Sequence, residues 1–211
     1  MIQANNISKI YKKGKREITA LPVTTLTIES TKFTVIYGKS GSGKTTLLNI
    51  LSGLLPPTQG QVLFNETNLY SLGDKELALF RNEKIGYIPQ GTSAVDSLTV
   101  LENIILPAKK SDAVKKAEEL LKRLDMEKLR DAYPGELSGG ELRRMAVARA
   151  LINSPATIFA DEPTNDLDEE NTRFVLNLLK EKSQNNVTVV VVSHDNAVLE
   201  YSDTVYEMKK E

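Results

Sequence analysis

A glycine-rich segment of eight residues, GKSGSGKT at Gly38–Thr45, constrains the fold of this chain more than any other feature. The run before it, Lys32–Tyr37 (KFTVIY), is short and rich in strand-forming residues. The run after it, TTLLNILSGLL, places leucine and isoleucine at helical spacing until Pro56 and Pro57 end the pattern. A strand, a glycine loop and a helix in this order open a parallel α/β unit, so we expect an α/β fold.

The residue types of this loop suit the binding of phosphate groups. Its pattern is G-x-x-x-x-G-K-[ST], in which glycine lets backbone N–H groups approach phosphate oxygens and the following helix N-terminus adds positive potential. We expect Lys44 to reach the β- and γ-phosphates of a nucleotide and the Thr45 hydroxyl to ligate Mg²⁺. An ordinary glycine-rich turn is the alternative, which the position between a strand and a helix disfavours. The loop residues predicted to bind the nucleotide are Gly38, Ser40, Gly41, Ser42, Gly43, Lys44, Thr45 and Thr46.

Two further predicted strands end in polar side chains. Thr157–Ala160 is expected to be a buried strand, and Asp161 and Glu162 follow it. Val187–Val192 is apolar without alternation, as expected for a strand covered on both faces, and His194 follows after one residue. Ligands of open α/β sheets bind at the carboxyl ends of strands, so we expect these side chains near the phosphate loop.

This placement gives each of these side chains a predicted role. Asp161 would ligate the metal ion held by Thr45, and Glu162 would polarise an attacking water. His194 would contact the γ-phosphate or orient that water. Simpler interpretations stay open, because the acidic pair could form a solvated turn and His194 could be a surface or capping residue. Asp195 could equally be a helix cap.

The middle of the chain, from about residue 91 to residue 151, is predicted to be mostly helical and to form a subdomain inserted between strands of the core. Its segment SDAVKKAEELLKRLD begins with the helix-start residues Ser111 and Asp112 and carries an apolar stripe. The residues of that stripe are Val114, Ala117, Leu120, Leu121 and Leu124. After this span the core resumes, and Glu169–Lys182 is expected to be a helix with its apolar face turned inward.

Composition excludes several classes of protein. The 27 Lys and Arg residues against 28 Asp and Glu give a net charge of -1, whereas nucleic-acid-binding domains are usually basic, so no nucleic-acid partner is expected. The one dense basic run, Lys9–Arg16, is more typical of a solvated hairpin. The absence of cysteine and the single histidine exclude thiol catalysis and a histidine-rich metal site. No apolar run approaches the roughly 20 residues of a membrane span and no signal peptide is evident, so we expect a cytoplasmic protein.

The segment LSGGELRRMAVARAL, which begins at Leu137, resembles the signature motif and following helix of the ABC (ATP-binding cassette) ATPases. The other motifs of that family occur in the family's order across nearly the whole chain. The matches are the phosphate loop at Gly38–Thr45, the Q-loop glutamine at Gln90, Walker B at Thr157–Glu162, the D-loop at Asn165–Asp168 and the switch histidine at His194. Tyr11 matches an aromatic residue that stacks on adenine, although it could equally be a hairpin side chain.

The resemblance implies a fold and a domain organisation. Residues 1–90 and 152–211 would form a RecA-like P-loop NTPase core, with a mixed, mainly parallel sheet and an antiparallel β subdomain. Residues from about 91 to 151 would form the inserted helical signature subdomain of this single nucleotide-binding domain. ATP and Mg²⁺ are the implied cofactors, and Gln90 would be a further Mg²⁺ ligand that reports the γ-phosphate to the helical subdomain.

The resemblance also implies a dimer. Two copies would meet head to tail around two ATP molecules, each held between one copy's phosphate loop and the other's signature. Ser138, Gly139, Gly140 and Glu141 would therefore bind nucleotide across the interface, with backbone donors at a helix start. Glu162 and His194 would be catalytic, and hydrolysis would reopen a dimer that ATP holds closed.

Several residues depart from the family pattern. Glu141 stands where glutamine is commoner, and Thr157 interrupts a Walker B strand that is usually apolar. Residues 30–32 replace a common Gly-Glu turn, and the short segment of residues 107–112 indicates a trimmed helical subdomain, near the groove that receives a partner's helix. Three arginines of the signature helix are interpreted as surface or interdomain salt-bridge residues without a catalytic role. They are Arg143, Arg144 and Arg149.

The segment SLTVLENIILP resembles the lipoprotein-release, macrolide-export and cell-division type of ABC ATPase. That type implies an integral membrane permease as partner, a peripheral location on the inner face of the membrane, and a motor function in export or mechanotransmission. One alternative is a soluble ABC ATPase of DNA repair or translation, which usually carries coiled-coil, zinc or duplicated-cassette additions. Another is a regulatory nucleotide-binding module without turnover, which the intact catalytic residues disfavour.

Overall fold

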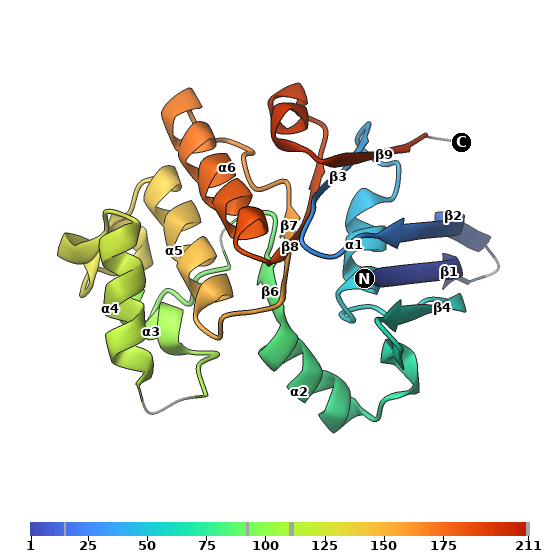
Figure 1. Cartoon of the computed structure of the whole chain (residues 1–211), viewed down its shortest axis with the longest axis horizontal. Coiled ribbons are helices and arrows are strands. Elements are labelled where there is room, and N and C mark those ends of the chain that lie inside the picture. The colour runs from blue at the N-terminus through green and yellow to red at the C-terminus, as the bar shows by residue number, and fades with distance from the viewer. Residues whose placement is uncertain (15, 92, 110–111, 210–211) are drawn as a thin grey trace.

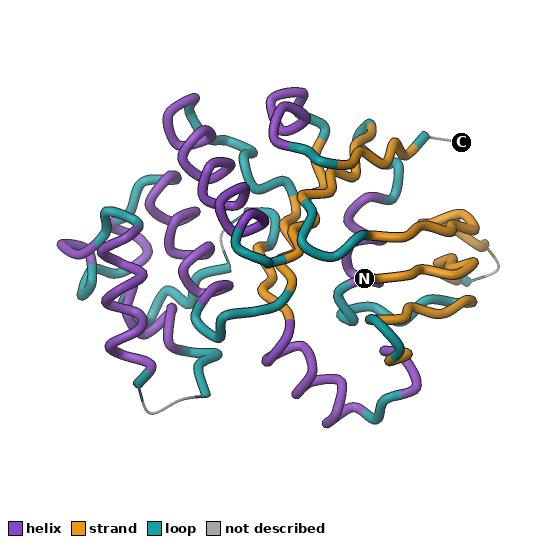
Figure 2. The backbone as a smooth tube through the Cα atoms, viewed as in Figure 1, coloured by secondary structure: helices purple, strands orange, loops and turns teal. Residues whose placement is uncertain are grey.

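The computed structural model describes residues 1–14, 16–91, 93–109 and 112–209, which form two sheets and a group of helices packed on the larger sheet (Figures 1 and 2). The strands are β1 Ile2–Lys13, β2 Arg16–Ile28, β3 Phe33–Gly38, β4 Gln59–Phe64, β5 Thr67–Asn68, β6 Ile85–Ile88, β7 Thr157–Asp161, β8 Thr188–Ser193 and β9 Thr204–Met208. The α-helices are α1 Lys44–Leu51, α2 Asp74–Lys84, α3 Val100–Ile105, α4 Ala113–Arg123, α5 Gly139–Leu151 and α6 Glu169–Gln184. Short 3₁₀ helices are η1 Leu69–Ser71, η2 Glu127–Leu129, η3 Pro134–Glu136 and η4 Asn196–Tyr201.

The larger sheet is parallel throughout and has the strand order β6-β7-β8-β3-β9. Every residue of β7 and β8 is buried. Alternate side chains of β8 enter different cores, because successive residues of a strand point to opposite faces. Val190 and Val192 join the cluster around α1, whereas Val189 and Val191 join the cluster beneath α5 and α6. The predicted α/β fold class with a mainly parallel sheet is confirmed.

The smaller sheet is antiparallel, with the order β2-β1-β4-β5. The described residues of the basic run at Lys9–Arg16 lie in the β1–β2 hairpin, as predicted, whereas Lys15 lies outside the described residues. Helix α1 lies between the two sheets in Figure 1, and its buried side chains include the apolar residues that the helical spacing indicated. This packing fixes the phosphate loop, because the loop joins β3 directly to α1.

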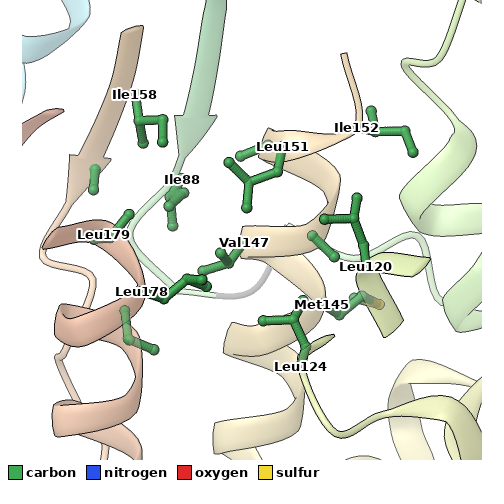
Figure 3. Close-up of a cluster of buried hydrophobic side chains, with 14 of the residues drawn as sticks. Ile88, Leu120, Leu124, Met145, Val147, Leu151, Ile152, Ile158, Leu178 and Leu179 are labelled. Atoms are coloured by element: carbon green, nitrogen blue, oxygen red, sulfur yellow. The ribbon is translucent and has the colours of Figure 1, made fainter. Parts of the chain in front are cut away.

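Helices α5 and α6 cover the other face of the larger sheet, α3 and α4 pack against α5, and the buried side chains of these helices form one continuous core with the sheet (Figure 3). In that view Val147 and Leu151 of α5 lie near Ile88 of β6, and Leu120 and Leu124 extend from the region of α4 toward α5. Burying one such aliphatic side chain contributes about 1.5–3 kcal/mol, so this contact region supplies much of the stability of the helical part.

Two predictions about the helices need correction or qualification. Val114 was expected on the apolar face of α4 but is 43% exposed, because the buried stripe begins only at Ala117. Asp112 lies at the helix start as expected, whereas Ser111 lies outside the described residues. Helix α2 was not predicted, because none of its residues is fully buried and its apolar contact comes from the half-buried Leu77 and Phe80 alone.

No helix within the described ranges combines the length and the apolar character that crossing a membrane requires.

Candidate active site

The phosphate loop connects the end of β3 to the first turn of α1, and a cavity of about 400 Å³ lies over it. Gly41 and Gly43 adopt positive φ values of 78° and 91°. A Cβ atom at Gly43 would lie 2.6 Å from the Ala20 carbonyl oxygen, so only glycine fits there. The cavity is lined by Ile18, Thr19, Ala20, Ser40, Gly41, Gly43, Lys44, Thr45, Thr46, Gln90 and Glu162.

Lys44 is buried, at 6% exposed, and its ammonium group folds back over the loop. Its Nζ donates hydrogen bonds to the Gly38 carbonyl at 2.7 Å and the Lys39 carbonyl at 3.2 Å. The same atom lies 3.6 Å from Oε1 of Glu162. The structure therefore places a positive charge between the loop and a carboxylate, at the wall of the cavity.

Thr45 and Asp161 meet although 116 positions separate them in the sequence. The Thr45 hydroxyl donates to Oδ1 of Asp161 at 3.0 Å. Burial raises the pKa of the Asp161 carboxyl, the Thr45 hydrogen bond lowers it, and the neighbouring Glu162 charge raises it again. A buried carboxylate beside a hydroxyl supplies the hard oxygen ligands that Mg²⁺ prefers.

Glu162 is held by the end of the adjacent strand β8. Its backbone has φ 45°, and its N–H donates to the Val192 carbonyl at 3.0 Å. Oε2 accepts from the Ser193 hydroxyl at 3.2 Å and from the His194 backbone N–H at 3.3 Å, and Nδ1 of His194 lies 3.0 Å from Oε1. The carboxylate is 7% exposed, so its orientation is fixed by these contacts.

Ser193 is a site residue that the sequence analysis missed. It is fully buried, donates to Glu162, and accepts from the Asp195 N–H at 3.0 Å. A serine at the end of an apolar strand carries no distinctive signal, and only its position before His194 could have identified it. Asp195 accepts from the Ala197 N–H and so begins η4, which is the capping position that the sequence left open.

The structure corrects the interpretation of the three arginines of α5. Each of them donates a hydrogen bond to a backbone carbonyl, and the structure gives none of them an ion pair within the described ranges. Arg143 is only 5% exposed and reaches the Pro89 carbonyl, next to Gln90. The reason is that α5 is packed on several sides: Arg143 and Arg149 lie against the segment after β6, and Arg144 lies against the end of α4.

The signature residues do not line the cavity over the phosphate loop of their own chain. Ser138 begins α5 as its N-cap and accepts from the Glu141 N–H, while the Glu141 carboxylate accepts from the Ser138 N–H and hydroxyl, both at 2.7 Å. These hydrogen bonds lower the pKa of Glu141. A Cβ at Gly139 would meet nothing within 4 Å, so this turn is open to a further molecule.

Tyr11 lies on β1, opposite Ile18 of β2, and is 44% exposed. Lys9 lies over its ring at 5.4 Å. Ile18 lines the cavity but Tyr11 does not, so an adenine contact for Tyr11 stays a prediction.

Comparisons with known proteins agree with this geometry. The ABC transporter family model matches residues 21–165. The chain is 41% identical to the lipoprotein-releasing system ATP-binding protein LolD of Buchnera aphidicola, covering 99% of this chain and 94% of that protein. It is 35% identical to the ABC transporter ATP-binding protein YtrE of Bacillus subtilis, with the same two coverages. Among solved structures, the chain is similar to the ATP-binding cassette MJ0796 of Methanocaldococcus jannaschii, a dimer in a post-hydrolysis state with ADP and Pi bound. The TM-score is 0.93 at 38% identity, and the match covers 99% of this chain and 94% of that chain.

Proposed function

Because this chain belongs to the ABC transporter family, we propose that it is the ATP-binding and ATP-hydrolysing motor subunit of a membrane transport complex of the lipoprotein-release type. One observation carries the proposal: three separate segments, which carry Lys44, the pair Asp161 and Glu162, and His194, converge around one phosphate loop. The loop with Lys44 binds phosphate, and Asp161 is a metal ligand. Glu162 is the base, and His194 orients it and the attacking water. Together these groups match the parts that phosphoryl transfer from a nucleotide requires.

The loop binds the phosphates of ATP. Its backbone N–H groups and the start of α1 point at the phosphates, and Lys44 exchanges its two carbonyl acceptors for phosphate oxygens. Thr45 and Asp161 would hold Mg²⁺ through their oxygen atoms, and Gln90 on the cavity wall would be a further ligand. When bound, Mg²⁺ neutralises phosphate charge and aligns the γ-phosphate for attack.

Glu162 acts as the general base. It is buried, and three donors from the end of β8 fix it in place, which holds its carboxylate where a water beside the γ-phosphate would lie. His194 is exposed on one side and bonded to Glu162 on the other. From that position His194 contacts the γ-phosphate and keeps the base and the attacking water in line.

The open signature turn implies that hydrolysis needs a second copy. Ser138, Gly139, Gly140 and Glu141 lie outside their own chain's cavity, so they serve the nucleotide of a partner in a head-to-tail dimer. Residues 91–151 then act as a helical unit set against the core of residues 1–90 and 152–211. Closure around ATP and reopening after hydrolysis supply the mechanical stroke.

A groove between α2, β6 and the end of α3 suits the permease. It has a volume of about 350 Å³ and is lined in part by Tyr87, Leu106 and Pro107. Leu106 is 59% exposed, and the Pro107 carbonyl is fixed by the side chains of Asn82 and Asn153, at 3.0 Å and 2.9 Å. A segment of a membrane permease docked here holds the motor on the inner face of the membrane.

The catalytic proposal is tested with Glu162→Gln, which keeps the size of the side chain but removes the base. We expect ATP binding and ATP-driven dimerisation to persist while turnover falls about 10²–10⁴-fold, the usual contribution of a positioned base. Turnover at the wild-type rate would remove Glu162 from this role. Binding without phosphate release in the wild-type protein would instead favour a regulatory module.

The partner proposal is tested by capture. Tagged Glu162→Gln, expressed in its source cell and supplied with Mg-ATP, should retain an integral membrane protein after gentle solubilisation. Adding Leu106→Asp should abolish that capture, whereas Val23→Asp should not, because Val23 is an equally exposed apolar residue (60%) on β2, outside the groove. Capture of ribosomes, DNA or soluble proteins alone would favour the alternative of a soluble ABC ATPase.

A further inference from the structure

Arg143 is a buried charged residue to which the proposed catalytic cycle gives no role. Its side chain is 5% exposed, and Nη1 donates to the Pro89 carbonyl at 2.8 Å. Keeping a guanidinium out of water is unfavourable, and burial lowers its pKa accordingly. The carboxylates of Asp166 and Asp161 act in the opposite direction and stabilise its charge. The Arg143 charge is therefore stabilised by Asp161 of Walker B and Asp166 of the D-loop, while its guanidinium donates a hydrogen bond to Pro89, in a third segment.

The bonded carbonyl lies at a sensitive position. Strand β6 is an edge strand of the larger sheet, and its pairing with β7 ends at Ile88 and Ala160. Pro89 follows immediately and is outside this ladder, so its carbonyl is held by Arg143 instead of by a strand. Gln90 comes next and lines the nucleotide cavity. The Arg143 hydrogen bond therefore fixes the position of the peptide group that joins Pro89 to Gln90.

The other end of the connection is the signature turn. Arg143 lies one turn after Gly139 and Gly140 in the same 13-residue helix, whose start is fixed by the reciprocal Ser138–Glu141 bonds. The first turn and Arg143 belong to one continuous helix, whose i→i−4 backbone hydrogen bonds connect them. A shift of the signature turn is therefore transmitted to Arg143 and from there to the Pro89 carbonyl.

We propose that Arg143 is a positioning residue that couples the two nucleotide sites of the dimer, by linking the signature turn to Gln90. The signature turn senses the nucleotide bound to the partner, and Gln90 contacts the nucleotide bound to the same chain. This inference rests on the head-to-tail dimer of the proposed function. It predicts that one site is adjusted when the other is filled, through a guanidinium that touches neither nucleotide.

The test measures the rate of ATP hydrolysis against ATP concentration for the purified full chain. Two coupled sites give the wild-type protein a Hill coefficient above 1 and at most about 2. Arg143→Gln removes the charge, and its shorter side chain does not reach the Pro89 carbonyl. We therefore expect the Hill coefficient to fall to about 1 and kcat to fall about tenfold. The half-saturating ATP concentration should change less than about twofold. Arg143→Lys keeps the charge and a donor and should restore at least half of the cooperativity.

Arg81→Gln is the matched control. Arg81 Nη1 also donates to a backbone carbonyl, that of Gly53 at 2.9 Å, but it lies on α2, and within the described ranges no hydrogen bond or ion pair joins it to α5 or Pro89. We expect this variant to keep the wild-type Hill coefficient and kcat. Melting temperatures of all variants, measured in parallel, separate loss of coupling from loss of folding.

The outcomes are distinct. Wild-type cooperativity in a folded Arg143→Gln would overturn the inference, as would equal losses in Arg143→Gln and Arg81→Gln. If Arg143→Gln does not fold, Arg143→Lys decides, and a folded Arg143→Lys without cooperativity overturns the inference. A wild-type protein that hydrolyses ATP with a Hill coefficient of 1 also refutes the coupling but leaves the proposed ATPase intact. A wild-type protein without hydrolysis refutes the proposed function itself, and the coupling with it.

Discussion

Gly139 and Gly140 are adjacent in the first turn of α5, yet the same substitution should have opposite effects on stability at the two positions. A Cβ at Gly139 would meet nothing within 4 Å. Glycine in a helix is about 0.5–1 kcal/mol less favourable than alanine, so Gly139→Ala should stabilise the fold by that amount. For a chain of this length the melting temperature should rise by about 1–4 °C.

A Cβ at Gly140 would lie 2.5 Å from Oδ1 of Asn171, on α6. Asn171 would have to rotate away, and its Nδ2 would lose the Asp168 carboxylate, which it contacts at 3.0 Å. Overpacking of this kind costs about 1–3 kcal/mol, which exceeds the gain from helix propensity. We expect Gly140→Ala to destabilise the fold by about 1–2 kcal/mol and to lower the melting temperature by about 2–8 °C.

Differential scanning calorimetry of the nucleotide-free protein compares the two variants directly. Both should hydrolyse ATP more slowly, since each added methyl group lies on the turn that faces the partner's nucleotide. Stability and turnover are therefore expected to change in opposite directions for Gly139→Ala alone. Equal shifts of melting temperature in the same direction would refute the packing argument at Asn171.

Two further predictions concern carboxylates. The Ser138 hydrogen bonds lower the pKa of Glu141, so its stabilising contribution is present above the unfolded pKa, near 4.3, and is lost as the pH falls through the folded value. Urea unfolding should therefore show Glu141→Gln less stable than wild type at pH 7 and equal to it well below pH 4. Burial raises the pKa of Asp161, so its charged form destabilises the fold above the folded pKa and ceases to do so at low pH. Thermal unfolding at pH 7 without nucleotide should show Asp161→Asn more stable than wild type, and Mg-ATP should no longer add further stabilisation.

The sequence predicted those parts of the molecule whose residue types leave few structural choices. A lysine and glycines between a strand and a helix dictate a phosphate loop, and an apolar run such as that of β8 dictates a buried parallel strand. The order of the ABC motifs predicted the family, whereas the α/β fold class already followed from the strand, the phosphate loop and the helix. These features are determined by neighbouring residues, so they can be read along the chain.

The remaining features depend on contacts between distant segments. Helix α2 packs with only the half-buried Leu77 and Phe80 and has no fully buried residue, so its periodicity was too weak to reveal it. Arg143 looked like a surface residue because its burial depends on how α5 packs against Pro89, 54 positions away. Ser193 acquires its role only because β8 lies beside β7, which brings its hydroxyl to Glu162.

The head-to-tail dimer is the central claim, and mixing two inactive variants tests it most directly. Lys44→Ala disables the phosphate loop, and Ser138→Arg blocks the signature turn. Neither alone should hydrolyse ATP, but an equimolar mixture contains mixed dimers in which one intact loop faces one intact signature. The account predicts that the mixture regains measurable turnover, up to about a quarter of the wild-type rate, because half of the dimers are mixed and each has one of two sites intact. Coupling between the two sites would lower the value below this bound. A mixture as inactive as its parents, in which mixed dimers nevertheless form with ATP, would contradict it.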